Sequence, residues 1–217
     1  MNKITDLIIN QGVLPLFFHK DTELSIKVME TLYSAGIKTL EYTNRGEAAF
    51  KNFEAMLKFK NTNFPDMKLG VGTIKNLEQA KSFVSISTDF VISPGLVDEV
   101  ADYCKNENML YIPGCMTPTE IIRAENLGLK MIKLFPGDKL EPSFLKSIKS
   151  IFPDLLFMPT GGVDTTPENI KSWFDAGVCA VGMGSKLISK NILEEKNYDL
   201  ILTETHKVLD IIKNIRN

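Results

Sequence analysis

Residues 126–138 read NLGLKMIKLFPGD, and this stretch contains the unit from which the whole chain is built. Gly128 follows a segment with helical spacing and precedes a short apolar run, where glycine accepts the left-handed backbone that ends a helix. The same order recurs in SAGIKTLEY (34–42) and DAGVCAVGM (175–183). A helix that ends at glycine and leads directly into a strand is therefore the repeating pattern.

Short apolar runs occur eight times, and most are apolar on both faces, as buried parallel strands are. They are VLPLFF (13–18), IKTLEYT (37–43), KLGVGT (68–73), DFVIS (89–93), MLYIP (109–113), KMIKLF (130–135), LLFMPT (155–160) and VCAVGMG (178–184). Helical segments separate them without a linker. The pattern predicts an α/β fold, a (β/α)8 TIM barrel that forms a single domain over residues 1–217, with flanking terminal helices at 2–11 and 198–215.

An open doubly wound sheet is the alternative architecture. It is disfavoured because the strand count reaches eight and no GxGxxG follows the first strand.

Three helices carry recognisable start signals. Asp21 precedes TELSIKVMETLYSA, Thr117-Pro118 precedes TEIIRAENL, and Thr166-Pro167 precedes ENIKSWFDA. Side chains of Asp and Thr accept hydrogen bonds from the first helical turn, and proline is favoured at the first helical position. Each signal predicts a helix between two strands.

The composition argues against several classes of partner. A net charge of −2 and a pI near 5.8 give no basic surface for nucleic acid or anionic membranes. No apolar segment has the roughly twenty residues of a membrane span, and the first residues lack the features of a signal peptide. Cys104, Cys115 and Cys179 are odd in number and widely spaced, which indicates reduced thiols rather than disulfides or a CxxC metal site. We expect a cytoplasmic protein.

Lys133 is the anomaly in KMIKLF, because lysine is almost never fully buried unless its charge is compensated. Alternate side chains of a strand share a face. If Ile132 and Leu134 pack on helices, Lys133 points into the barrel near its carboxyl end, where the active sites of such barrels lie. The same alternation in IKTLEYT places Glu41 inside. The pattern leaves open whether these two are catalytic groups, solvent-reaching side chains or a buried ion pair.

Further polar residues end neighbouring strands. Thr73 ends KLGVGT with the parity of Leu69 and Val71, and Thr160 ends LLFMPT. We expect both threonines at the inner top of the barrel. Arg45 lies just after the second strand.

Two glycine-rich turns predict a phosphate site. TGGV (160–163) follows the seventh strand and GMGS (182–185) follows the eighth, where barrels frequently bind phosphate through backbone N–H groups and a helix N-terminus. Ser185 is expected to add a hydroxyl at the start of the next helix. The alternative is that these are tight turns that need glycine only for conformation.

The residues favour covalent amine chemistry over a metal mechanism. The chain has only two histidines, His19 and His206, without HxH or HExxH spacing. A buried lysine amine favours its neutral form, and the neutral amine is the nucleophile. We therefore expect no metal and no other cofactor.

Six segments, in order along residues 11–190, resemble the 2-keto-3-deoxy-6-phosphogluconate aldolase family, whose members often also cleave 4-hydroxy-2-oxoglutarate. They are LEYTNR (40–45), GVGTI (70–74), ISPG (92–95), YIPGCMTPTE (111–120), KLFP (133–136) and PTGGV (159–163). The resemblance implies a metal-free class I aldolase that acts on a phosphorylated 2-keto acid, usually as a homotrimer.

The resemblance also implies a role for each matching residue. Lys133 is the expected Schiff-base residue, Glu41 the proton-transfer group and Arg45 the ligand of the substrate carboxylate. Thr73 and Thr160 are expected to line the keto-acid site. Pro94 and Phe135 are expected to form its apolar walls. The expected phosphate ligands are Gly161, Gly162, Gly184 and Ser185.

Two positions depart from the pattern. Met183 stands where many relatives carry a further glycine, and Lys186 follows the serine. These departures leave phosphate affinity and sugar stereochemistry open, so a 2-keto-3-deoxy-6-phosphogalactonate aldolase is an alternative. A phosphosugar isomerase or epimerase on the same barrel is another, and a non-catalytic phosphosugar-binding protein is the third.

Overall fold

The computed structural model describes residues 3–216 and contains nine strands within that range. Each of the eight predicted apolar runs contains a strand, as expected. The strands are β1 (Val13–Phe17), β2 (Thr39–Thr43), β3 (Lys68–Gly72), β4 (Phe90–Ile92), β5 (Leu110–Ile112), β6 (Gly114–Cys115), β7 (Met131–Leu134), β8 (Leu156–Pro159) and β9 (Val181–Met183). They pair in parallel in two sheets, of order β5-β4-β3-β2-β1-β9 and β6-β7-β8.

The short strand β6 is the one that the sequence did not predict. Pro113 separates it from β5, because proline has no backbone N–H to continue the ladder. The Pro113 carbonyl accepts from the Lys133 N–H at 2.9 Å, so the chain between β5 and β6 still contacts β7. At the other junction, Thr160 forms a parallel bridge with Gly182 of β9. The two curled sheets thus meet on both sides.

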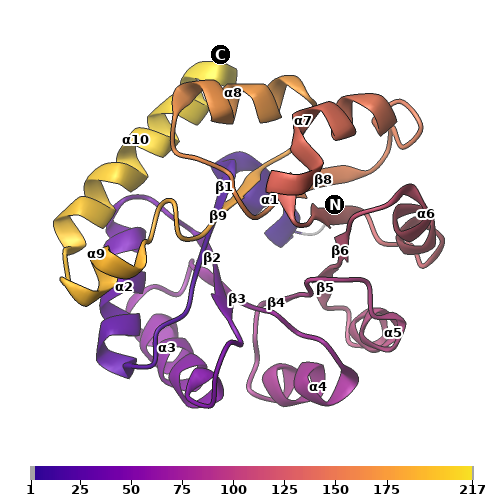
Figure 1. The fold of residues 1–217 in the computed structure, drawn as a ribbon. Coiled ribbons are helices and arrows are strands. Elements are labelled where there is room, and N and C mark those ends of the chain that lie inside the picture. Colours follow the sequence, from indigo (N-terminus) through magenta and orange to yellow (C-terminus); the bar gives the residue numbers. More distant parts are fainter. Residues whose placement is uncertain (1–2, 217) are drawn as a thin grey trace.

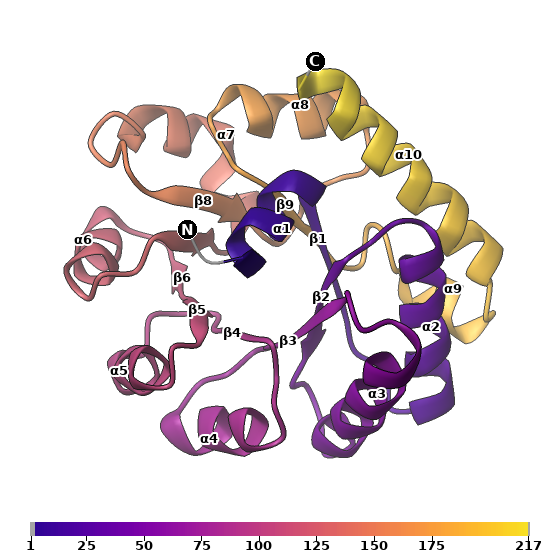
Figure 2. The same ribbon diagram turned by 180° about the vertical axis from the view of Figure 1, so that it is seen from behind.

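Ten helices accompany the strands in residues 3–216. They are α1 (Lys3–Gln11), α2 (Thr22–Ser34), α3 (Ala49–Asn63), α4 (Leu77–Ser85), α5 (Asp98–Asn106), α6 (Pro118–Asn126), α7 (Gly137–Ile148), α8 (Pro167–Asp175), α9 (Lys190–Glu194) and α10 (Tyr198–Arg216). Helices α2 to α10 lie outside the curled sheets, whereas α1 lies across one end of the strands (Figures 1 and 2). The two predicted terminal helices are confirmed within residues 3–216, and residue 2 of the first prediction lies outside the described residues. No helix among these residues is long and apolar enough to cross a membrane.

The helix boundaries follow the predicted signals. Gly36, Gly128 and Gly177 have φ of 100°, 83° and 95°, the left-handed backbone expected after a helix. The Asp21 carboxylate accepts from the Leu24 N–H at 2.9 Å. Thr117 forms a capping box at the start of α6, whereas Thr166 makes no side-chain cap and Pro167 alone begins α8.

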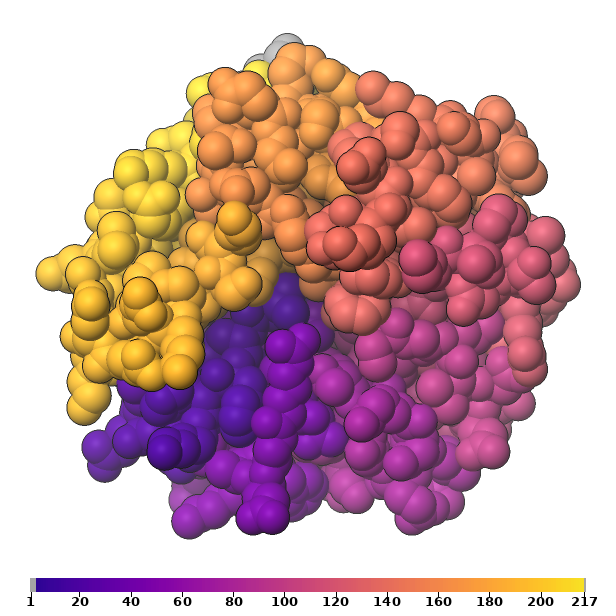
Figure 3. Space-filling model, in the orientation of Figure 1, coloured from indigo at the N-terminus to yellow at the C-terminus, as the bar shows by residue number. Residues whose placement is uncertain are grey.

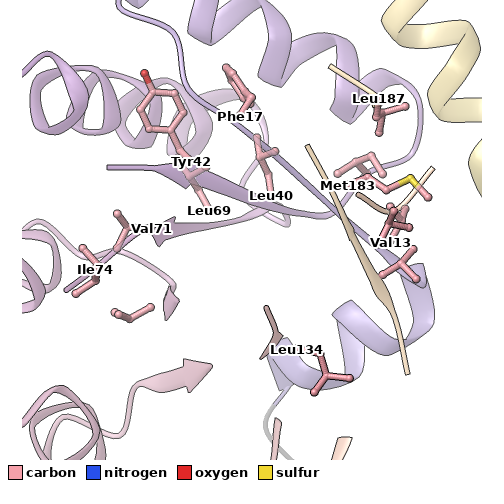
Figure 4. Packing of buried hydrophobic residues seen from close by; sticks show 14 of the residues in the cluster. Val13, Phe17, Leu40, Tyr42, Leu69, Val71, Ile74, Leu134, Met183 and Leu187 are labelled. Atoms are coloured by element: carbon pink, nitrogen blue, oxygen red, sulfur yellow. The ribbon is translucent and has the colours of Figure 1, made fainter. Parts of the chain in front are cut away.

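The strands are buried on both faces. Inside, Ile8 of α1 packs with residues from the strands and their edges, namely Leu14, Phe90, Ile92, Ile112, Met131, Met158 and Ala180. Outside, the other strand residues pack against the helices. Figure 4 shows part of this outer layer, with Leu40, Tyr42 and Met183. The apolar side chains packed with Ile8 fill the interior at the end of the strands next to α1. The opposite, carboxyl end of the interior is therefore left for polar side chains.

One prediction about strand faces is wrong. Leu69 and Val71 belong to the outer layer (Figure 4), whereas Gly70 and Gly72 face inward. Thr73 therefore does not reach the interior by simple alternation. Its φ of 64° breaks the alternation at the end of β3, and positive φ is strained for a β-branched residue.

Candidate active site

Two charged side chains meet inside the carboxyl end of the strands. Lys133 of β7 is 4% exposed and Glu41 of β2 is fully buried. Lys133 Nζ donates to Glu41 Oε1 at 3.4 Å. Ile132 and Leu134 lie in the outer layer, which confirms the predicted inward orientation of Lys133. A buried primary amine and a buried carboxylate are thus in direct contact.

Glycine makes room for this pair. A Cβ on Gly72 would lie 1.8 Å from Glu41 Oε1, because Gly72 faces inward beside Glu41 on the paired strand. A Cβ on Gly114, which is paired with Lys133, would lie 2.2 Å from the Pro94 carbonyl oxygen. A larger residue at position 72 would displace the Glu41 carboxylate, and one at position 114 would collide with the Pro94 backbone.

The walls of the site contain aromatic and hydroxyl groups. The Phe135 ring centroid lies 5.5 Å from Lys133 Nζ. Thr160 shares the inward parity of Met158, and a Cβ on Gly182 would lie 2.2 Å from its hydroxyl. Within residues 3–216, the buried Thr160 Oγ1 and Glu41 Oε2 have no hydrogen-bond partner. These atoms are available to a bound molecule.

Arg45 and Ser185 line one cavity of about 600 Å³ at the carboxyl ends of β1 and β2, and its lining includes neither Lys133 nor Glu41. Its other walls come from the ends of β1 and β2 and from α9, and include Leu16, His19 and Thr43. Figure 3 shows this face, on which the indigo segment at the end of β1 meets the orange segment that follows β9. Arg45 is exposed, and its guanidinium has no partner among the described residues.

The first glycine turn has the conformation that only glycine adopts easily. Gly161 and Gly162 have φ of 94° and 70°. The Gly137 N–H, at the start of α7, donates to the Thr160 carbonyl at 2.8 Å. A Cβ on Gly162 would lie 2.3 Å from Asp138 Cβ, so this turn packs closely on the start of α7.

The second glycine turn differs from the prediction in one respect. Ser185 does not begin a helix: Gly184 starts a turn in which its carbonyl accepts from the N–H groups of Leu187 and Ile188, and α9 begins only at Lys190. The loop lacks the periodic pattern that marks a helix start, so the sequence could not distinguish the two. Ser185 is exposed and lies at the rim of the cavity.

The two departures from the family pattern now have structural accounts. Met183 is fully buried in the outer layer and points away from the site (Figure 4). Lys186 Nζ pairs with Asp164 Oδ2 at 3.1 Å, which joins the two glycine turns. The hydrogen bond from Lys186 lowers the pKa of Asp164 despite partial desolvation. Asp164, directly after TGGV, and Gly72 lie near the site, and the sequence pattern predicted a role for neither.

A second cavity, of about 500 Å³, lies at the other end of the strands. Its lining includes Thr5, Met131 and Leu156, and excludes both Lys133 and Glu41. Within residues 3–216, no group of three or more His, Cys, Asp or Glu side chains is placed to hold a metal ion.

This geometry suits reactions of carbonyl compounds. An amine inside a largely apolar site can form an imine with a ketone, and an adjacent carboxylate can move the protons that imine formation requires. The unpartnered hydroxyl and the free guanidinium can bind the oxygen atoms of such a compound.

Comparison with known proteins agrees with this chemistry. Residues 4–203 match the family model described as KDPG and KHG aldolase. The 2-dehydro-3-deoxy-phosphogluconate aldolase of Pseudoalteromonas atlantica is 30% identical over 89% of this chain and 88% of its own length. The KHG/KDPG aldolase of Escherichia coli K12 is 30% identical over 87% of this chain and 86% of its own length.

A solved structure shows the same fold. The KDPG aldolase of Legionella pneumophila, with pyruvate captured as a covalent carbinolamine, has a TM-score of 0.87 and 28% identity, and the match covers 95% of this chain and 98% of that one.

Proposed function

Because the chain belongs to the KDPG and KHG aldolase family, we propose that it is a class I aldolase with Lys133 as its Schiff-base residue. It cleaves 2-keto-3-deoxy-6-phosphogluconate to pyruvate and glyceraldehyde 3-phosphate, and also 4-hydroxy-2-oxoglutarate to pyruvate and glyoxylate. The observation that carries the proposal is the contact between the buried amine of Lys133 and the buried carboxylate of Glu41.

The first half of the reaction forms the imine. A proton passes from Lys133 Nζ to Glu41 across the 3.4 Å contact, which leaves the neutral amine as nucleophile. The amine attacks the C2 ketone, and Glu41 returns its proton to the developing alkoxide. The resulting carbinolamine loses water to give an iminium on Lys133.

The second half breaks the carbon–carbon bond. The Glu41 carboxylate, directly or through water, takes the C4 hydroxyl proton as the C3–C4 electrons move into the iminium. The aldehyde leaves and an enamine remains. Protonation of the enamine at C3, followed by hydrolysis, releases pyruvate and restores the free amine.

The other residues hold the substrate. Arg45 binds the carboxylate, because a guanidinium can donate two parallel hydrogen bonds to it. Thr73 and Thr160 contact the keto-acid end between the apolar walls of Pro94 and Phe135. The phosphate is bound by the two glycine turns, through Gly161, Gly162, Gly184 and Ser185.

Reductive trapping tests the proposal. Incubation with pyruvate and borohydride should convert the iminium into a stable secondary amine, and peptide mass spectrometry should locate it on Lys133. The Lys133→Ala variant should not be labelled and should lose cleavage activity. A label on another lysine would overturn the assignment.

The architecture and assembly belong to the same proposal. We propose a single domain whose strands close into a (β/α)8 barrel, supported by the contacts at Pro113 and at Thr160. A homotrimer follows from the family resemblance, and exposed Met116 and Ile122 beside and within α6 offer apolar surface. Light scattering should give three times 24.3 kDa. A cytoplasmic location remains a prediction from the three free thiols.

Kinetics separate the alternatives. An aldolase for the galactonate epimer keeps Lys133 and differs only at the aldehyde end, so kcat/KM on the two phosphorylated epimers and on 4-hydroxy-2-oxoglutarate distinguishes them. A phosphosugar isomerase, an epimerase or a binding protein needs no amine, and none of these would be trapped by pyruvate and borohydride.

A further inference from the structure

The cavity lined by Arg45 and Ser185 lies further along β2 than Glu41 does. Thr43, which lines it, is two residues beyond Glu41 on β2, and two strand residues span about 6–7 Å. Neither Lys133 nor Glu41 lines the cavity. A substrate that is attached to Lys133 by its ketone and points toward the carboxyl ends of the strands would bring its far end to this space. The phosphate ester of a six-carbon substrate reaches further than the second carboxylate of 4-hydroxy-2-oxoglutarate.

Positively charged side chains line the cavity. Lys20 lines it and has no carboxylate partner within residues 3–216, and Arg45, the proposed ligand of the substrate carboxylate, also lines it. The third cation, Lys190, is paired with Glu194 at 3.5 Å. With Arg45 assigned to the carboxylate, the unpaired Lys20 and the hydroxyl of Ser185 in the same lining favour a second anionic group.

His19 contributes a donor whose direction is fixed. Its Nδ1 accepts from the Asp21 N–H at 3.1 Å. In the neutral ring the proton is therefore on Nε2, at the far edge of the imidazole. Because His19 lines the cavity, this N–H is the ring's remaining group for a bound molecule.

Buried residues hold the backbone of this loop. The His19 carbonyl accepts from Tyr42 Oη at 2.7 Å and from Asn52 Nδ2 at 2.9 Å. Asn52 also donates to the Lys20 carbonyl and accepts from Thr22. Tyr42 and Asn52 are buried. The loop after β1 is thus held in place before any molecule binds, which lowers the entropic cost of using it in recognition.

We propose that His19 is a specificity-determining residue, whose Nε2–H donates to the phosphate group of the substrate in the cavity shared with Ser185. This inference rests on the proposed aldolase function and adds the group by which the enzyme distinguishes phosphorylated from unphosphorylated substrates.

The His19→Asn variant tests it. Asparagine Oδ1 can still accept from the Asp21 N–H, but the variant lacks a donor at the Nε2 position. We expect kcat/KM for 2-keto-3-deoxy-6-phosphogluconate to fall by about tenfold or more, the loss of one charged hydrogen bond, and that for unphosphorylated 2-keto-3-deoxygluconate to change by less than about twofold. His19→Gln, which extends a donor further, should recover part of the loss. Equal losses on both substrates, no loss, or no recovery by Gln would overturn the proposal.

Two controls separate this proposal from the aldolase function. Pyruvate carries no phosphate, so borohydride trapping on Lys133 should be equally fast in wild type and His19→Asn. Calorimetry with glycerol 3-phosphate measures the phosphate site without turnover, and binding should weaken in His19→Asn. If glycerol 3-phosphate binds more weakly to His19→Asn but pyruvate is not trapped even on the wild type, the proposed aldolase function is rejected and the anion site is supported. Normal trapping with unchanged binding would reject the role of His19.

Discussion

Substitution of Gly72 by alanine tests the link between packing and catalysis most directly. The new Cβ would lie 1.8 Å from Glu41 Oε1, whereas real Cβ contacts are essentially never below 3.0 Å. The β3 backbone cannot easily yield, because Gly72 is paired with Thr43 and its carbonyl accepts from the Asn44 N–H at 2.8 Å. The Glu41 side chain must therefore move by about 1.2 Å or more, as these two distances require.

A movement of this size separates the carboxylate from the amine. The contact between Lys133 Nζ and Glu41 Oε1 is already 3.4 Å, near the limit of a hydrogen bond. Misplacement of a catalytic group by 1 Å costs on the order of 10²-fold in rate. We expect kcat of Gly72→Ala to fall by about that factor, and crowding to cost about 1–3 kcal/mol of stability.

The assay compares kcat, the rate of pyruvate trapping and the thermal midpoint. Gly95→Ala is the matched control, since no atom lies within 4 Å of its added Cβ, and it should resemble wild type. In Gly72→Ala/Glu41→Asp, the shorter acid leaves room for the methyl group, so part of the stability should return while activity stays low. A Gly72→Ala enzyme within about threefold of the wild-type kcat would refute the argument from displacement.

Three further predictions follow from the site. Ser185→Ala should raise KM for phosphorylated substrate by about tenfold and leave unphosphorylated substrate unaffected in steady-state kinetics, and equal effects on both would contradict a phosphate contact. Asp164→Asn should lower stability by about 0.3–1 kcal/mol at neutral pH, because a half-exposed ion pair with Lys186 is lost. Folding lowers the pKa of Asp164, so the stability that the ion pair contributes is complete above the unfolded pKa near 3.8. It disappears as the pH falls through the lower pKa of the folded state. Thermal melts from pH 7 to 2.5 at low salt can follow this loss. Thr160→Val should raise the thermal midpoint, by removing a buried hydroxyl without a partner, and should slow pyruvate trapping, whereas a destabilised variant would contradict this account of the hydroxyl.

Local pattern predicted the elements and the inward residues, because helix ends and strand alternation depend on neighbouring residues. Gly128 ends its helix as expected, and alternation places Lys133 and Glu41 inside. Their mutual contact joins positions 92 residues apart and depends on the pairing of strands around the sheets, which no local pattern contains. The predicted face of β3 that leads to Thr73 and the predicted helix start at Ser185 were wrong for a different reason. Each lies where a strand gives way to a loop, and a single φ or turn there changes the direction of the chain.

The polar atoms of the interior explain why the site is costly to the fold and useful to the reaction. Glu41 Oε2, Thr160 Oγ1 and Thr39 Oγ1 are buried without a partner in residues 3–216, and each such atom costs about 1–3 kcal/mol relative to a satisfied one. Glycine at positions 72 and 182 keeps the space around the first two open, although a larger residue would fill it. A fold selected for stability alone would bury methyl groups there. The retained cost at Glu41 and Thr160 is expected of groups whose partners arrive with the substrate, so that binding energy is gained where the amine reacts.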